Sequence, residues 1–154
     1  MAKKNFSFSI AIDGSSASGK TTGSKFIAKK FKFKLLSSGK LYRYLALRII
    51  KNKGKYNYSF VKKVAKSITL KKLNTNQLYD PKVTRLSSVI AKKKNIRASL
   101  KKFQLNFIKK NKRVIIEGRD IASKIIPHAN LKIFFKCSLK EKAKRRFKEF
   151  KKIN

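Results

Sequence analysis

Residues 14–22 read Gly-Ser-Ser-Ala-Ser-Gly-Lys-Thr-Thr, and this stretch decides the fold. It matches Gly-x-x-x-x-Gly-Lys-[Ser/Thr] at every fixed position, a pattern in which backbone N–H groups and the lysine hold phosphates. Residues 6–12 alternate and then run apolar into Asp13 and Gly14, which is typical of a buried strand that ends in a turn. A helical pattern follows over about residues 20–31. A strand, a glycine-rich loop and a helix in this order predict an anion site at the helix N-terminus.

The residues of this loop have expected roles. Gly14 and Gly19 permit the sharp backbone path, and Lys20 would reach the β- and γ-phosphates as a catalytic residue. The Thr21 hydroxyl is placed for Mg²⁺, and Asp13 could hold a metal-bound water. An ATP-type triphosphate is the expected ligand, and the alternative is a chance glycine turn between a strand and a helix. The expected cofactor-binding residues of the loop are Gly14, Ser15, Ser16, Ala17, Ser18, Gly19, Lys20, Thr21 and Thr22.

The rest of the chain also favours an α/β protein. Strand patterns occur at residues 33–36, 114–116 and 131–137, and helical patterns occur at 40–50 and 139–150. Residues 58–110 read as helices interrupted by a weak extended patch at 67–73 and a turn near 74–81. Strands that alternate with helices predict a three-layer fold with a central parallel sheet. We therefore expect a P-loop NTPase fold with a helical excursion in the middle.

Length and composition restrict the class of protein. A chain of 154 residues with 42% hydrophobic content suits one domain. The single cysteine excludes a disulfide framework, and a structural zinc site is not expected because no Cys/His cluster has ligand spacing. No apolar run approaches the roughly 18 residues of a membrane helix, and the first residues do not read as a secretory signal. We expect a cytoplasmic protein with no membrane partner.

The net charge of +37 is large enough to attract any polyanion, so a nucleic-acid binder has to be considered. The basic residues are 35 Lys and only 8 Arg, in a chain also rich in Ile, Phe and Asn, all residues of A/T-rich codons. Codon drift would turn replaceable surface residues into lysine without a functional demand. An arginine that survives such drift is expected to do what lysine cannot, such as bidentate phosphate recognition.

A P-loop indicates a nucleotide but not a reaction. The Asn-Lys-x-Asp signature of GTPases is absent from the sequence. Small kinases need a second phosphate site for the acceptor, because two polyanions must be held together during in-line transfer. The surviving arginines suit that requirement.

Three segments resemble bacterial cytidylate kinases. The first is residues 10–22, which open with two apolar residues and Asp-Gly as that family's loop does. The second is residues 36–46, Leu-Ser-Ser-Gly-Lys-Leu-Tyr-Arg-Tyr-Leu-Ala, and the third is residues 116–121, Ile-Glu-Gly-Arg-Asp-Ile, with the strand after it. They occur in the family's order and spacing, and the resemblance runs over about residues 8–151.

The resemblance implies a set of site residues. Ser38 and Arg43 match the acceptor-site serine and arginine, and Arg97 matches a second phosphate-binding arginine. Ser88 falls where a hydroxyl reads cytosine. The catalytic pair Arg119 and Asp120 would also hold the acceptor, and Arg145 and Arg146 would reach the ATP phosphates. The implied substrate-binding residues are Ser38, Arg43, Ser88, Arg97, Arg119 and Asp120.

Some of these residues have simpler interpretations. Arg43 could pair with an acid, the Ser88 hydroxyl could bond its own helix, and Asp120 could cap the segment after it. The sequence also departs from the family at Ser37 and Glu117, where the family has aspartate, and its residues 67–81 look shorter than the family's β insert. The family continues beyond the position of Asn154 into a lid, a strand and a helix, so the chain looks like a shortened or interrupted homologue.

The expected function is a monomeric nucleoside monophosphate kinase that uses ATP and Mg²⁺ to phosphorylate CMP or dCMP, without a specific nucleic-acid partner. Two alternatives remain open from the sequence. One is a P-loop kinase with another small acceptor. The other is a catalytically lapsed P-loop domain that binds polyanions or nucleic acid through its charge.

Overall fold

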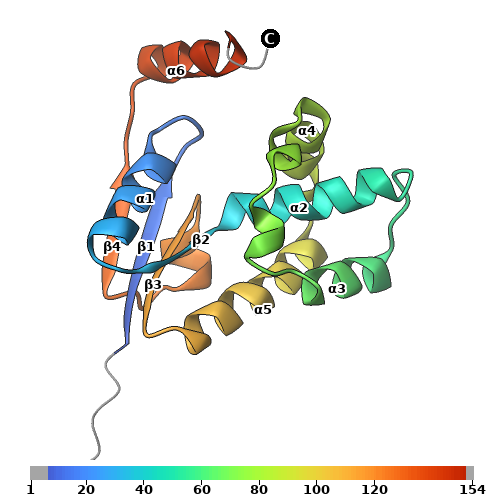
Figure 1. Ribbon diagram of the computed structural model, residues 1–154, viewed down its shortest axis with the longest axis horizontal. Helices are drawn as coiled ribbons and strands as arrows, with labels where there is room; N and C mark the ends of the chain where they lie inside the picture. Colours follow the sequence, from blue (N-terminus) through green and yellow to red (C-terminus); the bar gives the residue numbers. More distant parts are fainter. Residues whose placement is uncertain (1–6, 152–154) are drawn as a thin grey trace, which may run out of the picture. The chain divides into compact units, whose positions relative to one another are not determined.

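The computed structural model describes residues 7–151, apart from the side chains of residues 146 and 149–151. The chain divides into two compact units (Figure 1). Unit 1 consists of Met1–Leu35 and Asn111–Asn154, and unit 2 is Leu36–Lys110. The loop that decided the sequence interpretation lies in unit 1, so this unit is described first.

Unit 1 is built on a parallel sheet. Its strands are β1 (Phe8–Gly14), β2 (Lys34–Ser37), β3 (Arg113–Gly118) and β4 (Leu131–Phe135), in the order β2-β3-β1-β4. The boundary between the units falls inside β2. Strand β1 runs parallel to both of its neighbours, and Ile12 faces Glu117 on one side and Ile133 on the other. The predicted α/β class with a central parallel sheet is therefore confirmed.

The core of unit 1 follows from the period-2 pattern of its strands. Ile10, Ile12 and Ile115 form a buried cluster, against which Phe8, Ile27, Ala28, Phe33, Leu35, Ile133 and Phe135 pack. Alternate residues of a strand point to the same face, so the apolar face of β1 is covered by helix α1 (Lys20–Lys30). The end of β1 and the start of α1 are thereby held together, and the loop between them is fixed at both ends.

Two further elements complete unit 1. A π-helical turn at Ile121–Ile125 follows β3, and helix α6 (Leu139–Lys151) follows β4. The turn was not predicted, whereas α6 was predicted over residues 139–150. Strand β3 extends beyond the predicted residues 114–116 at both ends. Strand β1 extends through Asp13 to Gly14 but begins only at Phe8, whereas the pattern placed residue 7 in it as well.

Unit 2 is helical. It contains α2 (Ser38–Lys51), α3 (Tyr58–Lys66), α4 (Pro81–Ile90) and α5 (Lys94–Lys110), together with 3₁₀ turns at Lys71–Leu73 and Asn76–Tyr79. Its core is aliphatic, with the fully buried residues Leu41, Leu45, Leu78, Ile90, Ile96 and Leu100. Asp80 caps α4 by accepting hydrogen bonds from the backbone N–H groups of Lys82 and Val83, and Pro81 occupies the first turn, where its missing N–H costs nothing.

The extended patch predicted at residues 67–73 is wrong. Ser67 ends α3, and the 3₁₀ turn begins at Lys71. Ile68 and Thr69 are β-branched, which favours extended backbone, but a strand needs a partner, and none pairs with this segment among the described residues. Ile68 and Leu73 are buried instead as anchors of a compact connection.

Helix α2 begins at Ser38, whereas the sequence pattern placed its start near residue 40. Across residues 7–151, no helix combines the length and the apolar character that crossing a membrane requires.

Candidate functional site

The loop between β1 and α1 takes a strained path. Ala17 and Gly19 both have left-handed backbones, with φ of 59° and 90°. For a residue with a side chain this conformation costs about 1–2 kcal/mol, and such strain is concentrated at ligand-binding loops. At Gly14, an added Cβ would lie 2.8 Å from the Phe135 carbonyl oxygen, so the close approach of β4 requires glycine there. The loop geometry depends on the two glycines that the motif specifies.

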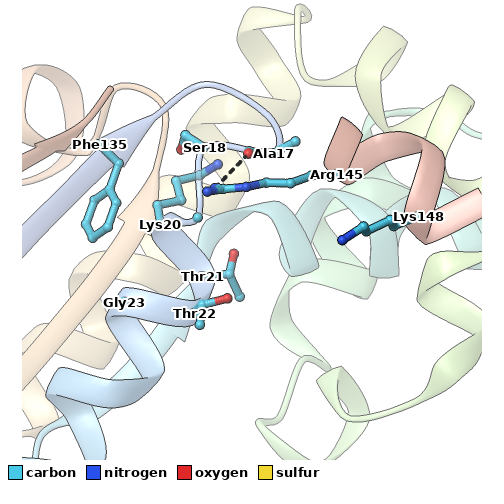
Figure 2. A pocket seen from close by; sticks show the side chains of 10 residues that line it. Ala17, Ser18, Lys20, Thr21, Thr22, Gly23, Phe135, Arg145 and Lys148 are labelled. Atoms are coloured by element: carbon cyan, nitrogen blue, oxygen red, sulfur yellow. Dashed lines mark hydrogen bonds between the residues drawn. The ribbon is translucent and has the colours of Figure 1, made fainter. Parts of the chain in front are cut away.

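A cavity of about 720 Å³ opens over this loop (Figure 2). Its wall combines the loop and the first turn of α1 with residues of β4 and α6. The lining residues are Ala17, Ser18, Gly19, Lys20, Thr21, Thr22, Gly23, Phe135, Arg145 and Lys148. Three of them are cationic and none is acidic, so the cavity is suited to an anion.

The polar groups of the loop fit a phosphate. The first turn of α1 has no acidic side chain, and its cap residue Gly19 offers no side-chain acceptor to the helix N–H groups. The buried Ser18 hydroxyl has no hydrogen-bond partner among the described residues. Phosphate oxygens are acceptors, and a helix N-terminus attracts negative charge. The loop therefore presents donors where a phosphate would supply the acceptors.

The side chain of Lys20 is held by the loop between β1 and α1. Its ammonium donates a 2.9 Å hydrogen bond to the Ser15 carbonyl oxygen. Burial lowers the pKa of Lys20 below 10.5; nearby Arg119 adds to that shift, while the carboxylates of Glu117 and Asp13 oppose it. A negatively charged ligand beside Lys20 would favour its charged form, so the site suits an anion better than a neutral molecule.

Thr21 contacts an acidic residue. Its hydroxyl lies 2.9 Å from Oε2 and 3.1 Å from Oε1 of Glu117, to which it donates. Glu117 is only 2% exposed and is the last residue but one of β3, the strand next to β1. A hydroxyl and a carboxylate are oxygen ligands of the kind that Mg²⁺ prefers. The described residues contain no cluster of three His, Cys, Asp or Glu side chains, so an ion bound here would take its remaining ligands from phosphate and water.

Glu117 was not among the predicted site residues. The sequence nevertheless carried a signal: it is one of only six acidic residues and it follows directly on an apolar run in a strongly basic chain. What the sequence could not show is that β3 lies next to β1, which is what brings its last side chains to the loop.

Asp13 forms a latch between β1 and the π-helical turn. Its Oδ1 accepts a hydrogen bond from the Ile121 N–H and its Oδ2 accepts one from the Ala122 N–H, both at 2.8 Å. Asp13 is 5% exposed. Asp120 is the residue before the turn, but its side chain does not cap it. The N–H groups at the start of the turn are instead capped by Asp13, from β1. The predicted role of Asp13 in holding a metal-bound water stays a prediction.

The segment that this latch holds carries the predicted catalytic pair. Arg119 is exposed and Asp120 is half-buried, immediately after Gly118 at the end of β3. The Asp120 carbonyl oxygen accepts a hydrogen bond from the Lys124 N–H, which closes the turn. The pair thus lies at the carboxyl end of the strand next to β1, at the edge of the sheet from which the phosphate loop also leaves.

Arg145 reaches the loop from α6 (Figure 2). Its Nε bonds Glu141 at 2.9 Å, one turn earlier in the helix, and its Nη1 donates to the Ala17 carbonyl oxygen at 3.4 Å. An added Cβ on Gly19 would lie 2.9 Å from the same guanidinium nitrogen. The structure thus brings Arg145 to the phosphate cradle. The side chain of Arg146 lies outside the described residues.

Four of the six predicted acceptor residues, Ser38, Arg43, Ser88 and Arg97, lie in unit 2. The Ser38 hydroxyl accepts a 2.8 Å hydrogen bond from Nε2 of Gln104. The Arg43 guanidinium lies 4.9 Å from the centre of the Tyr79 ring and bonds the Leu78 carbonyl oxygen at 3.4 Å. Arg97 donates to the Ala91 carbonyl oxygen at 3.2 Å. Each of these side chains is held in place by contacts within unit 2.

Ser88 is different. It is exposed on α4, and its hydroxyl bonds the Thr84 carbonyl oxygen one turn earlier, at 3.2 Å. This is the local bond that a helical serine commonly makes. The predicted role in reading cytosine stays a prediction that no contact of Ser88 supports.

Comparison with known proteins gives one consistent result. The family model described as cytidylate kinase matches residues 10–154. A cytidylate kinase of Fusobacterium nucleatum is 33% identical over 92% of this chain and 69% of its own length, and one of Thermosipho africanus is 37% identical over 91% and 67%. A cytidylate kinase of Mycoplasmoides gallisepticum is 36% identical over 97% and 70%. The chain therefore spans about two thirds of the length of these relatives.

Proposed function

Since this chain belongs to the cytidylate kinase family, we propose that it is a nucleoside monophosphate kinase that transfers the γ-phosphoryl group of ATP to CMP or dCMP. The products are ADP and CDP or dCDP. The observation that carries the proposal is the phosphate loop, in which Lys20 borders a cavity lined by no acidic side chain and Thr21 contacts the buried Glu117. These features suit a triphosphate with its metal.

Both compact units belong to one P-loop kinase domain in this proposal. Unit 1 supplies the groups that hold ATP, and the helical region at about residues 58–110 forms the excursion that binds the acceptor. The acceptor residues Ser38 and Arg43 lie just before it on α2. This division suits a reaction in which two phosphorylated molecules must each be bound and oriented.

The donor side acts by positioning and by charge neutralisation. Bound ATP would supply the transferred phosphoryl group, and a Mg²⁺ ion would supply neutralisation of the phosphate charge. The N–H groups at the start of α1 and the Lys20 ammonium orient these phosphates. Thr21 and Glu117 would hold the metal ion, and the Arg145 guanidinium, which already contacts the loop at Ala17, would neutralise further charge.

The acceptor side binds the monophosphate. Arg43 and Arg97 present planar guanidinium groups that bind a phosphate bidentately. Arg119 and Asp120 hold the acceptor at the carboxyl end of β3. In the transfer, an oxygen of the acceptor phosphate bonds to the γ-phosphorus while the bond from that phosphorus to the bridging oxygen of ADP breaks. The residues stabilise the charge that builds up and provide no covalent intermediate.

A coupled assay of ADP release tests the proposal. Purified protein is mixed with ATP and Mg²⁺ and with CMP, dCMP, UMP or AMP in turn, and Lys20→Met is the matched inactive control. We expect ADP release that depends on CMP or dCMP and is lost in the variant. ADP release that depends on another monophosphate would favour a kinase with a different acceptor. The absence of transfer to all four would refute the proposal.

The net charge of +37 favours a second candidate, a P-loop domain that binds polyanions without catalysis. The two candidates differ in how binding responds to salt. A polyanion binder prefers RNA to CMP and loses affinity steeply as salt rises, because counterions are released on binding. A kinase site saturates with CMP at one molecule per chain. Calorimetric titrations with CMP and with a single-stranded RNA at two salt concentrations separate the candidates.

A further inference from the structure

One buried amide in unit 2 has no role in the proposed function so far. Gln104 lies on α5 and is only 1% exposed. Its Nε2 donates a 2.8 Å hydrogen bond to the Ser38 hydroxyl, which is itself 7% exposed. The pair joins the middle of α5 to the first residue of α2. It is a contact between two buried polar side chains far apart in the sequence.

The position of Gln104 is unusual for a polar residue. The buried face of α5 consists of Ile96, Leu100, Gln104 and Phe107, so Gln104 stands where the helical period calls for an apolar side chain. A buried polar group is tolerated only when it is hydrogen-bonded, and an apolar residue of the same size would serve packing equally well. This points to a requirement for the amide itself.

The direction of the hydrogen bond explains why an amide is required at residue 104. The amide N–H donates, so the Ser38 oxygen accepts and its own proton points elsewhere. Among the described residues, no acceptor receives that proton, although the side chain is more than nine-tenths buried. The proton of the Ser38 hydroxyl therefore has no acceptor in the part of the chain that the structure describes.

The surroundings of this donor suit an anion. Ser38 is the first residue of α2, a helix of 14 residues whose N-terminal N–H groups and dipole favour negative charge. Its cap residue Ser37 makes no side-chain bond to the helix, and the first turn contains no acidic side chain. A hydroxyl proton without a described acceptor and a helix N-terminus without a side-chain cap thus occur at the same residue.

We propose that Gln104 is a positioning residue that fixes the Ser38 hydroxyl as a hydrogen-bond donor toward the phosphate of the monophosphate acceptor. The inference rests on the proposed function, since it takes the acceptor to be CMP or dCMP. Gln104 does not touch the acceptor. It occupies one lone pair of the Ser38 oxygen, and the phosphate, whose oxygens can only accept, takes the hydroxyl proton.

The variant Gln104→Glu tests the direction of the bond with almost no change in shape. An ionised carboxylate can only accept, so it would take the Ser38 proton and turn the oxygen lone pairs toward the phosphate. We expect CMP affinity, measured by calorimetry on the full chain, to fall about tenfold to a hundredfold, the range of a hydrogen bond to a charged group. The affinity for ATP should not change.

The pH dependence gives a readout that a purely structural role would not produce. A protonated carboxyl can donate to Ser38 as the amide does, so the loss relative to the parent should shrink as pH falls from about 8 to 5. Gln104→Met removes the donor without reversing the bond and should give a smaller, pH-independent loss. Gln77→Glu makes the same chemical change at an exposed residue of the same unit, and should leave CMP affinity unchanged.

A double-mutant cycle with Ser38→Ala separates bond direction from simple charge repulsion. Without the hydroxyl, Gln104→Glu should cost nothing further in CMP affinity. An equal cost with and without Ser38 would show repulsion only and would overturn the inference, as would parent-like CMP affinity in folded Gln104→Glu. If the parent chain itself bound no CMP, the proposed function would fall, and the inference with it; CMP binding without transfer would affect only the proposed function.

Discussion

Asp13→Asn is the change that separates the observed contacts of Asp13 from its predicted role at a metal. The aspartate is 5% exposed and accepts one backbone hydrogen bond on each oxygen, from Ile121 and Ala122. The amide has the same shape but only one oxygen, so one N–H of the π-helical turn would face an NH₂ group instead of an acceptor. The variant therefore loses one charge-assisted bond and leaves one donor unpaired.

The magnitude follows from these two contacts. A hydrogen bond to a charged group contributes about 1.5–3 kcal/mol, and an unpaired buried donor adds to its loss, so we expect Asp13→Asn to lower the free energy of unfolding by about 2–4 kcal/mol. Asp80→Asn is the matched control. Asp80 also accepts two backbone N–H bonds, but it is exposed at the start of α4, where Asn caps a helix about as well as Asp. The control should change stability by only about a few tenths of a kcal/mol.

Urea unfolding followed by circular dichroism, in buffer without metal, measures both variants against the parent. For a slope of about 2 kcal/mol per molar urea, the midpoint of Asp13→Asn should fall by about 1–2 M. Parent-like unfolding in metal-free buffer, together with a changed Mg²⁺ dependence of ATP binding, would refute the latch and favour the metal role. A loss of the same size in Asp80→Asn would show that burial of the two bonds is not what matters.

Three further changes test the site. Lys20→Met should abolish ATP binding. Because the folded state lowers the pKa of Lys20 below 10.5, the variant should also have a higher melting temperature than the parent near neutral pH. Melting curves should show this gain disappearing as pH rises through the lowered pKa toward 10.5. Thr21→Val removes the donor to the buried Glu117 and should cost about 1.5–3 kcal/mol of stability in denaturant titrations, whereas Thr21→Ser should not; equal losses would contradict the hydroxyl's role. Arg43→Lys or Arg97→Lys should weaken CMP binding in calorimetry by about 1–3 kcal/mol, because lysine lacks the planar fork, and a matching loss of ATP affinity would argue against a separate acceptor site.

Much of unit 1 could be predicted because its signals are local. A glycine is needed wherever the backbone turns sharply or approaches another strand, so Gly14 and Gly19 mark the loop in the sequence itself. The apolar alternation of β1 and the run into Asp13 mark the strand before it. Short-range patterns of this kind survive in any tertiary context, which is why the loop and the flanking strand and helix were placed correctly.

Predictions that depended on a partner were less successful. The patch at residues 67–73 has β-branched residues but no neighbouring strand, so it forms a connection that ends in a 3₁₀ turn. The π-helical turn at Ile121–Ile125 was missed because its cap, Asp13, lies 108 residues away from the N–H of Ile121 that it accepts. A hydrogen bond between residues that are far apart in the chain leaves no periodic pattern in the sequence.

The sequence by itself determined the class of fold, the phosphate loop with Lys20 and Thr21, and the resemblance that indicated cytidylate kinases. Only the tertiary structure decided what the buried polar side chains do. Glu117 bonds Thr21 because β3 lies beside β1, and Gln104 bonds Ser38 because α5 packs on α2. The physical reason is that a buried polar group must find its partner in space, and the partner's position depends on how the strands and helices pack rather than on any neighbour in the chain.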